Sequence, residues 1–242
     1  MNHLRKIIFA HLIIVISLLL CSCGTQHSIR DDVIYQDDNF GYDRLISNGI
    51  VIGGVASKEI KFTNDERIKY GSLLSNILIE QLKAVQIINT LQLIGKIGKE
   101  NYFRIMGEFD ADKILLNDDI RAIEESIPEI EYIILSYIKN ENIRNKSYTE
   151  TTADDKGEYK TVFETTYSIA VEFQIYDVFK EKIVWNNIMY NEAVKIQSRT
   201  EDSLLGVVVG DVMSEAFVNI DRKDVLEEIY QKFAEGLVET NN

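Results

Sequence analysis

Residues 50–91 read IVIGGVASKEIKFTNDERIKYGSLLSNILIEQLKAVQIINTL, and this stretch decides the fold class. It begins with the short apolar run 50–56, whose β-branched side chains favour a buried strand. Thr63 and Glu66 have the spacing of a capping box, and the apolar residues that follow them recur at helical intervals. Residues 86–91 read QIINTL, with the β-branched pair Ile87 and Ile88, and follow the helix closely. The segment predicts a strand, a helix and a second strand, parallel to the first and joined to it by a right-handed crossover.

The adjacent glycines Gly53 and Gly54 raise the question of a phosphate-binding loop. Neither a G-x-G-x-x-G pattern nor a Lys followed by Ser or Thr accompanies them. A β-bulge, or a close approach of another segment to the backbone, explains two glycines in a strand more simply. We therefore predict a structural role for this pair.

An alternating pattern follows in the second half of the chain. Within residues 159–175, apolar side chains occupy most odd positions. The polar residues of the other face are Glu164, Thr166, Ser168, Glu172 and Gln174. A turn signal at 153–157 precedes this strand, and another at 180–182 leads into a strand over 183–196. Together with the apolar run 131–138, the pattern predicts three antiparallel strands in a meander.

Helical spacing predicts the remaining elements. We expect short helices over 101–107 and 117–126, a helical apolar stripe over 204–220, and a last amphipathic helix capped by Asp221. The predicted fold class is α/β, an α+β sandwich. Its mixed sheet starts with a strand-helix-strand unit, continues as an antiparallel meander and is flanked by amphipathic helices.

The N-terminus has the features of a bacterial export signal. Arg5 and Lys6 precede an apolar stretch of 14 residues, 7–20, which is shorter than the ~20 residues that a membrane-spanning helix needs. The next residues, Leu20-Cys21-Ser22-Cys23, resemble the lipobox of bacterial lipoproteins. The resemblance implies cleavage between Ser22 and Cys23 and attachment of a diacylglyceryl group to Cys23, with a further acyl chain such as palmitate on its amine.

Lipidation of Cys23 would anchor the chain stably to a membrane, because several acyl chains bind far more strongly than one. Two alternatives remain at this point: a plain cleaved signal that leaves Cys23 free, and an uncleaved N-terminal anchor helix. Gly24 follows Cys23, and the enteric sorting rule then favours the outer membrane, with the domain facing the periplasm. The predicted organisation is a signal peptide over 1–22, a lipidated tether over 23–48 and a single α/β domain over 49–242.

Loss of the signal peptide changes the chemical inventory of the 242-residue chain. It removes two bases and no acid, so the formal net charge changes from −13 to −15. His27 in the tether is then the only His, and the predicted domain has no Cys. Catalysis by His or Cys, thiolate zinc sites and disulfides are thereby excluded, and the acidic balance argues against a nucleic-acid partner.

Carboxylates are the one catalytic class that the inventory leaves open. A glycosidase needs two of them facing each other across a cleft. The candidate pairs are Asp31-Asp32, Asp37-Asp38, Asp110 with Asp112, Asp118-Asp119 and Asp154-Asp155. Adjacent acids are expected on solvated loops in so acidic a chain, and a calcium loop at 110–112 lacks the following ligand and glycine. We therefore nominate no catalytic, cofactor or metal-binding residue.

The order of elements resembles a group of bacterial lipoproteins that includes the curli-secretion lipoprotein and the activator of a peptidoglycan synthase. The resemblance is carried by the apolar strand 50–56, by Tyr176-Asp177 and by Ile183-Val184-Trp185-Asn186 after a tight turn. It implies a sandwich similar to the anticodon-binding domain and a function that depends on contact with other proteins. Charged residues around Lys139 argue against a membrane-inserted pore, and the tether is shorter than that of the synthase activator.

These features predict a non-enzymatic envelope lipoprotein that acts by protein–protein contact in envelope assembly or maintenance. The alternatives are an oligomeric component of an outer-membrane secretion channel and a carboxylate-dependent glycan enzyme. Two contact surfaces are predicted: the hairpin tip with Asp154, Asp155 and Tyr159, and the helical stripe with Leu204, Leu205 and Val208. The partner protein is not identified, and self-association into a homo-oligomer is left open.

Overall fold

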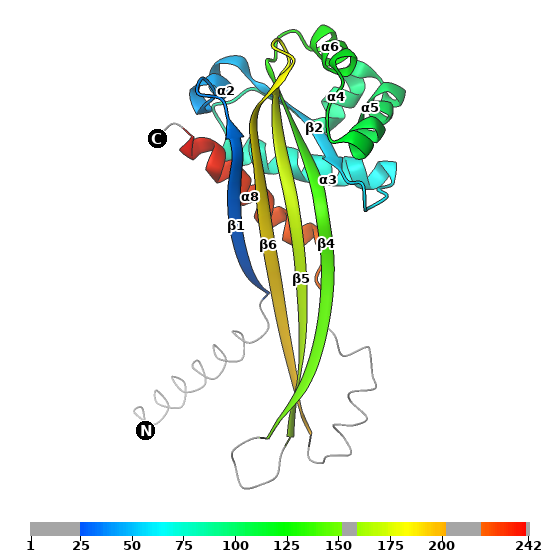
Figure 1. The fold of residues 1–242 in the computed structure, drawn as a ribbon, viewed down its shortest axis with the longest axis vertical. Coiled ribbons are helices and arrows are strands. Elements are labelled where there is room, and N and C mark those ends of the chain that lie inside the picture. Colours follow the sequence, from blue (N-terminus) through cyan, green and yellow to red (C-terminus); the bar gives the residue numbers. More distant parts are fainter. Residues whose placement is uncertain (1–24, 152–158, 202–218, 241–242) are drawn as a thin grey trace, which may run out of the picture. The chain divides into compact units, whose positions relative to one another are not determined.

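A computed structural model describes residues 25–151, 159–201 and 219–240 (Figure 1). These residues form six helices and a six-stranded mixed sheet, which confirms the predicted α/β class. The strands lie side by side in the order β1-β6-β5-β4-β2-β3. None of the described helices is long and apolar enough to cross a membrane.

The described elements have the following bounds. The strands are β1 (Gln26–Gln36), β2 (Ile50–Ala56), β3 (Ile87–Ile88), β4 (Tyr132–Thr151), β5 (Tyr159–Asp177) and β6 (Lys182–Glu201). The helices are α2 (Tyr42–Asn48), α3 (Asn64–Gln81), α4 (Thr90–Ile97), α5 (Lys99–Asp112), α6 (Asn117–Ser126) and α8 (Arg222–Glu239).

The predicted strand-helix-strand unit is confirmed. β2 pairs in parallel with β3 and with β4, and α3 connects β2 to β3. The Thr63 hydroxyl accepts a hydrogen bond from the Glu66 N–H at 3.2 Å, while the Glu66 carboxylate accepts one from the Thr63 N–H at 2.9 Å. This is the capping box that the spacing predicts.

β3 is shorter than predicted, because a helix begins directly after it. Asn89 accepts a hydrogen bond from the Gln92 N–H at 2.9 Å, and the Gln92 side chain accepts one from the Asn89 N–H at 3.0 Å. This second capping box starts α4, a helix that the sequence analysis did not predict. The spacing of Asn89 and Gln92 was the signal for it.

Gly53 and Gly54 have the structural role predicted for them. The register between β2 and β4 shifts between Ile52 and Gly54, which marks a bulge. Gly54 has a φ of +136°, and a Cβ atom there would lie 2.5 Å from the hydroxyl oxygen of Tyr102. A Cβ atom at Gly53 would lie 2.5 Å from a methyl group of Leu135. The backbone passes too close to its neighbours for larger side chains.

Figure 1 shows α3 and α8 behind the strands and α4, α5 and α6 beside β2. On one face Phe173 of β5 stacks on Phe233 of α8, with ring centroids 3.9 Å apart, and Trp185 of β6 packs against the same ring. On the other face, buried residues of β2 and β4 share one apolar cluster with α4, α5 and α6. The core therefore consists of two apolar layers, one on each side of the sheet.

The polar face of β5 is buried at Glu172 and Gln174 and half-buried at Glu164, Thr166 and Ser168. Glu172 is 6% exposed and Gln174 4% exposed. The Glu172 carboxylate lies 2.7 Å from Lys113 Nζ at the end of α5 and 3.6 Å from Lys139 Nζ of β4. The side chains of Gln174 and Asn186 also donate hydrogen bonds to it. A second layer of helices covers this face, so each polar group there needs a partner.

The segment predicted as a tether contains regular structure. β1 is a strand of the sheet next to β6, and α2 follows it, so the sheet begins before residue 49. β4 is also longer than predicted and continues through the polar stretch 139–151. In both segments pairing with a neighbouring strand outweighs the weak local pattern.

The chain divides into two compact units. Of the described residues, one unit comprises 28–142, 168–192 and 221–240, and the other comprises 25–27, 143–151, 159–167, 193–201 and 219–220. Nearly all of β1, the whole of β2 and β3, and the described helices belong to the first unit.

Candidate functional site

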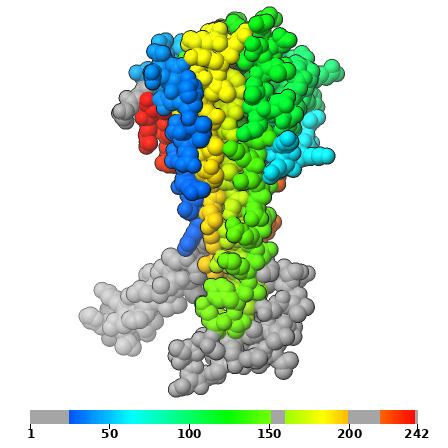
Figure 2. Space-filling view, in the orientation of Figure 1, coloured from blue at the N-terminus to red at the C-terminus, as the bar shows by residue number. Residues whose placement is uncertain are grey.

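β1 forms an open edge of the sheet. Its only neighbour among the described strands is β6, so the backbone groups on its other side have no partner strand there. Figure 2 shows β1 as a ridge, in dark blue, along the border of the described surface. An open edge offers N–H and C=O groups to a strand of another molecule.

The C-terminal half of β1 exposes three consecutive apolar side chains. Val33 is 54% exposed, Ile34 58% and Tyr35 45%. Soluble proteins usually protect an edge strand with charges, prolines or a short length. β1 has 11 residues and no proline, and its charged residues, Arg30 to Asp32, all precede this triplet. The triplet is therefore a candidate contact surface.

Contacts at both ends hold β1 against β6. The guanidinium carbon of Arg30 lies 4.4 Å from the centre of the Tyr190 ring. Just beyond β1, Asp37 accepts a hydrogen bond from Lys182 Nζ at 2.5 Å, and its N–H donates to the Val184 carbonyl at 2.8 Å. The hydrogen bond from Lys182 lowers the pKa of Asp37 to about 2. Contacts within the chain therefore hold β1 in place without a binding partner.

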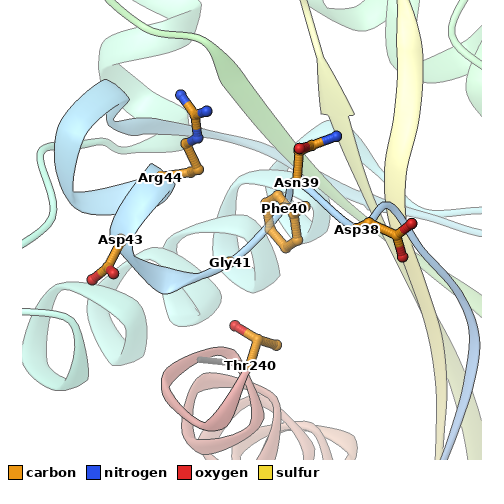
Figure 3. A pocket seen from close by; sticks show the side chains of 7 residues that line it. All are labelled: Asp38, Asn39, Phe40, Gly41, Asp43, Arg44 and Thr240. Carbon is orange, nitrogen blue, oxygen red and sulfur yellow. The ribbon is translucent and has the colours of Figure 1, made fainter. Parts of the chain in front are cut away.

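A shallow pocket of about 390 Å³ follows β1 in the chain. It is lined by Asp38, Asn39, Phe40, Gly41, Asp43, Arg44 and, from the end of α8, Thr240 (Figure 3). Figure 3 shows the Asp38 and Asp43 side chains on opposite sides of the opening, pointing away from each other. The pocket therefore does not present the facing carboxylates that a glycosidase requires.

β3 is the open edge at the opposite end of the sheet. A second pocket, of about 250 Å³, lies beside it and is lined by Ile79, Leu82, Lys83, Val85, Ile87, Asn89 and Gln92. Ile79 is 44% exposed, and Leu91, between the last two lining residues, is 56% exposed. This edge is short, but it combines an apolar hollow with one lysine.

In three of the candidate acidic pairs, one acid is bound by a Lys or Arg side chain. Asp110 accepts hydrogen bonds from the Arg67 guanidinium, Asp119 accepts one from Arg104 at 2.7 Å, and Asp37 is bound to Lys182. Asp31 and Asp32 are consecutive in a strand, so their side chains point to opposite faces. In the part of the chain that the structure describes, no three His, Cys, Asp or Glu side chains are grouped to hold a metal ion.

Most residues of the predicted sites lie outside the described residues. This applies to the lipidation site, Ser22 and Cys23, and to the predicted contact residues Asp154, Asp155, Leu204, Leu205 and Val208. Tyr159 is the first residue of β5, and its side chain is not described.

The sequence analysis missed the β1 edge, because the Asp-rich surroundings of this segment suggested a tether. The run Val33-Ile34-Tyr35, three side chains that favour strands, was the available signal.

No family model matches the chain, and no curated protein matches it. Among solved structures, it is similar to the PelC dodecamer from Paraburkholderia phytofirmans, with 12% identity and a TM-score of 0.36 over 88% of this chain and 97% of that chain.

It is also similar to the LpoB C-terminal domain from Salmonella enterica, with 9% identity and a TM-score of 0.32 over 69% of this chain and 88% of that one. A minor lipoprotein from Acinetobacter baumannii matches with 12% identity and a TM-score of 0.29, over 81% of this chain and 95% of that one. TM-scores this low do not establish a shared fold, so function is inferred from the chain's own residues.

Proposed function

We propose that this chain is a lipid-anchored lipoprotein of the bacterial envelope that acts by contact with other proteins through the open edge of β1. The observation that carries the proposal is the run of three exposed apolar side chains, Val33 to Tyr35, on an edge strand whose outer side has no partner among the described strands. A partner strand can add to such an edge, because backbone hydrogen bonds provide affinity and alternate side chains provide specificity.

The position of β1 relative to the lipobox supports a contact close to the membrane. β1 begins at Gln26, three residues after Cys23. Three residues span at most about 11 Å, so lipid on Cys23 would hold the first residue of β1 near the headgroups. The proposal places the protein on the periplasmic side of the outer membrane, as Gly24 at the second mature position favours.

The chemical inventory supports contact over catalysis. Removal of the signal peptide leaves His27 as the only His, and lipidation would consume Cys23. Asp37 accepts a hydrogen bond from Lys182 that lowers its pKa to about 2. A carboxylate with so low a pKa is a poor general acid, because the base stabilises its charged form.

Site-specific photocrosslinking in membranes of the native host tests the proposal. A photoreactive side chain at Ile34 should yield a discrete adduct, whereas the same group at Val238, which is 42% exposed on α8, should not. In a Cys23→Ala chain the Ile34 adduct should decrease strongly, because the chain is no longer concentrated at the membrane. Equal adducts from both positions, or none from Ile34, would contradict a contact through β1.

A further inference from the structure

The two open edges of the sheet have complementary features. β1 offers exposed apolar side chains, and β3 lies beside an apolar hollow lined by Ile79, Leu82, Val85 and Ile87. The hollow, at about 250 Å³, is smaller than the roughly 300 to 1,000 Å³ of small-molecule sites. Its size and lining therefore suit an apolar side chain of a protein better than a metabolite.

The charges at the two edges are also complementary. Asp32 on β1 and Lys83 at the pocket have no ion pair within the described residues. Asp32 and Ile34 are two positions apart in β1, so both side chains project from the same face, roughly 7 Å apart along the strand. An apolar side chain and an acid at this spacing match a hollow that has a lysine on its wall.

We infer that β1 of one copy docks against β3 of a second copy, with Ile34 in the pocket and Asp32 beside Lys83. The inference rests on the proposed function, in which β1 is the contact edge, and it names the occupant of that edge. β3 has only two residues, so few backbone hydrogen bonds can form with β1. The pocket and the ion pair therefore provide most of the affinity of the contact. Anchoring in one membrane favours the contact, because it raises the local concentration of copies.

The proposed contact is heterologous, because it joins two different surfaces of identical chains. A pair of copies then retains one free β1 edge and one free β3 edge, and further copies can add head to tail until a ring closes. An isologous dimer through β1 alone would stop at two copies. The two arrangements therefore predict different behaviour in mixtures of variants.

Mixing two variants of the full lipidated chain in detergent tests the inference. Ile34→Lys blocks the β1 surface, and Ile79→Lys blocks the pocket; both side chains are exposed, so folding should be unaffected. The wild type should form species larger than a dimer, and each variant alone should be monomeric. The mixture should form one-to-one dimers and nothing larger, because only one compatible pair of surfaces remains. Val238→Lys is the matched surface control and should assemble like the wild type.

A wild type that stays monomeric at high concentration would overturn the inference. So would a mixture that forms no dimer, or an Ile34→Lys chain that still assembles. Circular dichroism of each variant separates loss of contact from loss of fold, and a misfolded Ile34→Lys or Ile79→Lys is replaced by the milder Ile34→Ser or Ile79→Ser.

Charge reversal tests the Asp32–Lys83 pair separately. Asp32→Lys or Lys83→Asp alone should weaken self-association about tenfold, because a reversed charge replaces attraction by repulsion. The double variant should recover most of the wild-type affinity. Recovery is the informative result, since loss in the single variants alone could arise from a general change of charge. Failure of the double variant to recover would overturn the predicted pairing.

Disulfide trapping in membranes separates this inference from the proposed function. Ile34→Cys and Ile79→Cys in one chain should give a ladder of covalent oligomers on oxidation, whereas the two single variants mixed should give only a dimer. No Cys lies beyond Cys23 to interfere. If the Ile34 photoadduct has a mass that is not a multiple of the chain and the ladder is absent, the proposed function stands and self-docking is wrong.

Discussion

Lys182 Nζ lies 2.5 Å from an oxygen of Asp37, so the end of β1 is bound to the start of β6. The two residues are 145 positions apart in the sequence. The Asp37 N–H also donates to the Val184 carbonyl, and together these bonds hold the edge strand in place. The candidate contact surface therefore depends on a long-range pair at its end.

The Asp37–Lys182 pair should make the stability of the β1 edge depend on pH in the acid range. The hydrogen bond from Lys182 lowers the pKa of Asp37 from the usual 3.8 to about 2. A lowered pKa stabilises the folded state above the unfolded pKa, and that contribution is lost as the pH falls from about 4 to about 2. Urea unfolding across this window should show the decrease.

The Asp37→Asn variant is the control for this pH dependence, because its side chain does not titrate. Its unfolding should depend less on pH between about 4 and 2 than that of the wild type, and amides of residues 26–36 should exchange hydrogen faster at neutral pH. Identical pH profiles for the two chains would show that the pair does not stabilise the edge.

Glu172→Gln should destabilise the protein by about 2 kcal/mol, because it leaves two lysines beside a neutral side chain in a largely buried site. Burial raises the pKa of Glu172, but hydrogen bonds from Lys113, Gln174 and Asn186 together lower it below the usual value. The carboxylate is thus charged at neutral pH. Chemical denaturation measures the loss. Glu129→Gln removes an exposed ion pair to Lys96 and should change stability by less than about 0.5 kcal/mol.

Gly54→Ala should destabilise the protein by about 1 to 3 kcal/mol, since the residue has positive φ and a Cβ atom would meet the Tyr102 hydroxyl. Thermal unfolding detects the change. Gly95→Ala is the matched control: nothing lies within 4 Å of its Cβ position in α4, so it should stabilise the helix by roughly 0.5 to 1 kcal/mol.

Two causes could destabilise Gly54→Ala: the positive φ of the residue and the contact of its Cβ atom with the Tyr102 hydroxyl. The double variant Gly54→Ala with Tyr102→Phe separates them. The Tyr102 hydroxyl is buried without a hydrogen-bond partner in the described structure, so its removal should cost little by itself. If the steric contact contributes, the double variant should recover part of the loss. No recovery would assign the whole effect to the backbone conformation.

Phe233→Ala should destabilise the protein by about 3 to 5 kcal/mol, because it opens a cavity between α8 and the sheet. The ring stacks on Phe173 and contacts Trp185, and all three side chains are buried. Calorimetry or urea unfolding provides the measurement. Val238→Ala, on the exposed side of the same helix, should change stability by less than about 0.5 kcal/mol. Similar effects for the two variants would show that α8 does not contribute to the core in this way.

Local signals predicted the elements that depend on neighbours in the sequence. The apolar run of β2, the capping box of α3, the bounds of α6 and the Asp221 cap of α8 all agree with the structure. Each of these rests on side chains within a few residues of one another, where spacing translates directly into geometry.

Elements that depend on distant partners were missed or described wrongly. β1 lacks a clear pattern and exists as a strand because it pairs with β6. Glu172 alternates like a solvent-facing residue, yet Lys113 and Lys139 surround it. Alternation along a strand shows which side chains share a face, but not what covers that face.

By itself, the sequence determined the chemical inventory of this protein: the lipobox pattern, the scarcity of His and Cys after it, and the local helix and strand signals. Only the tertiary structure decided which strands lie at the edges of the sheet and which side chains line the pockets beside them. The physical reason is that an edge is defined by the absence of a neighbouring strand. Whether a strand has such a neighbour depends on remote parts of the chain, and the local spacing of residues does not contain that information.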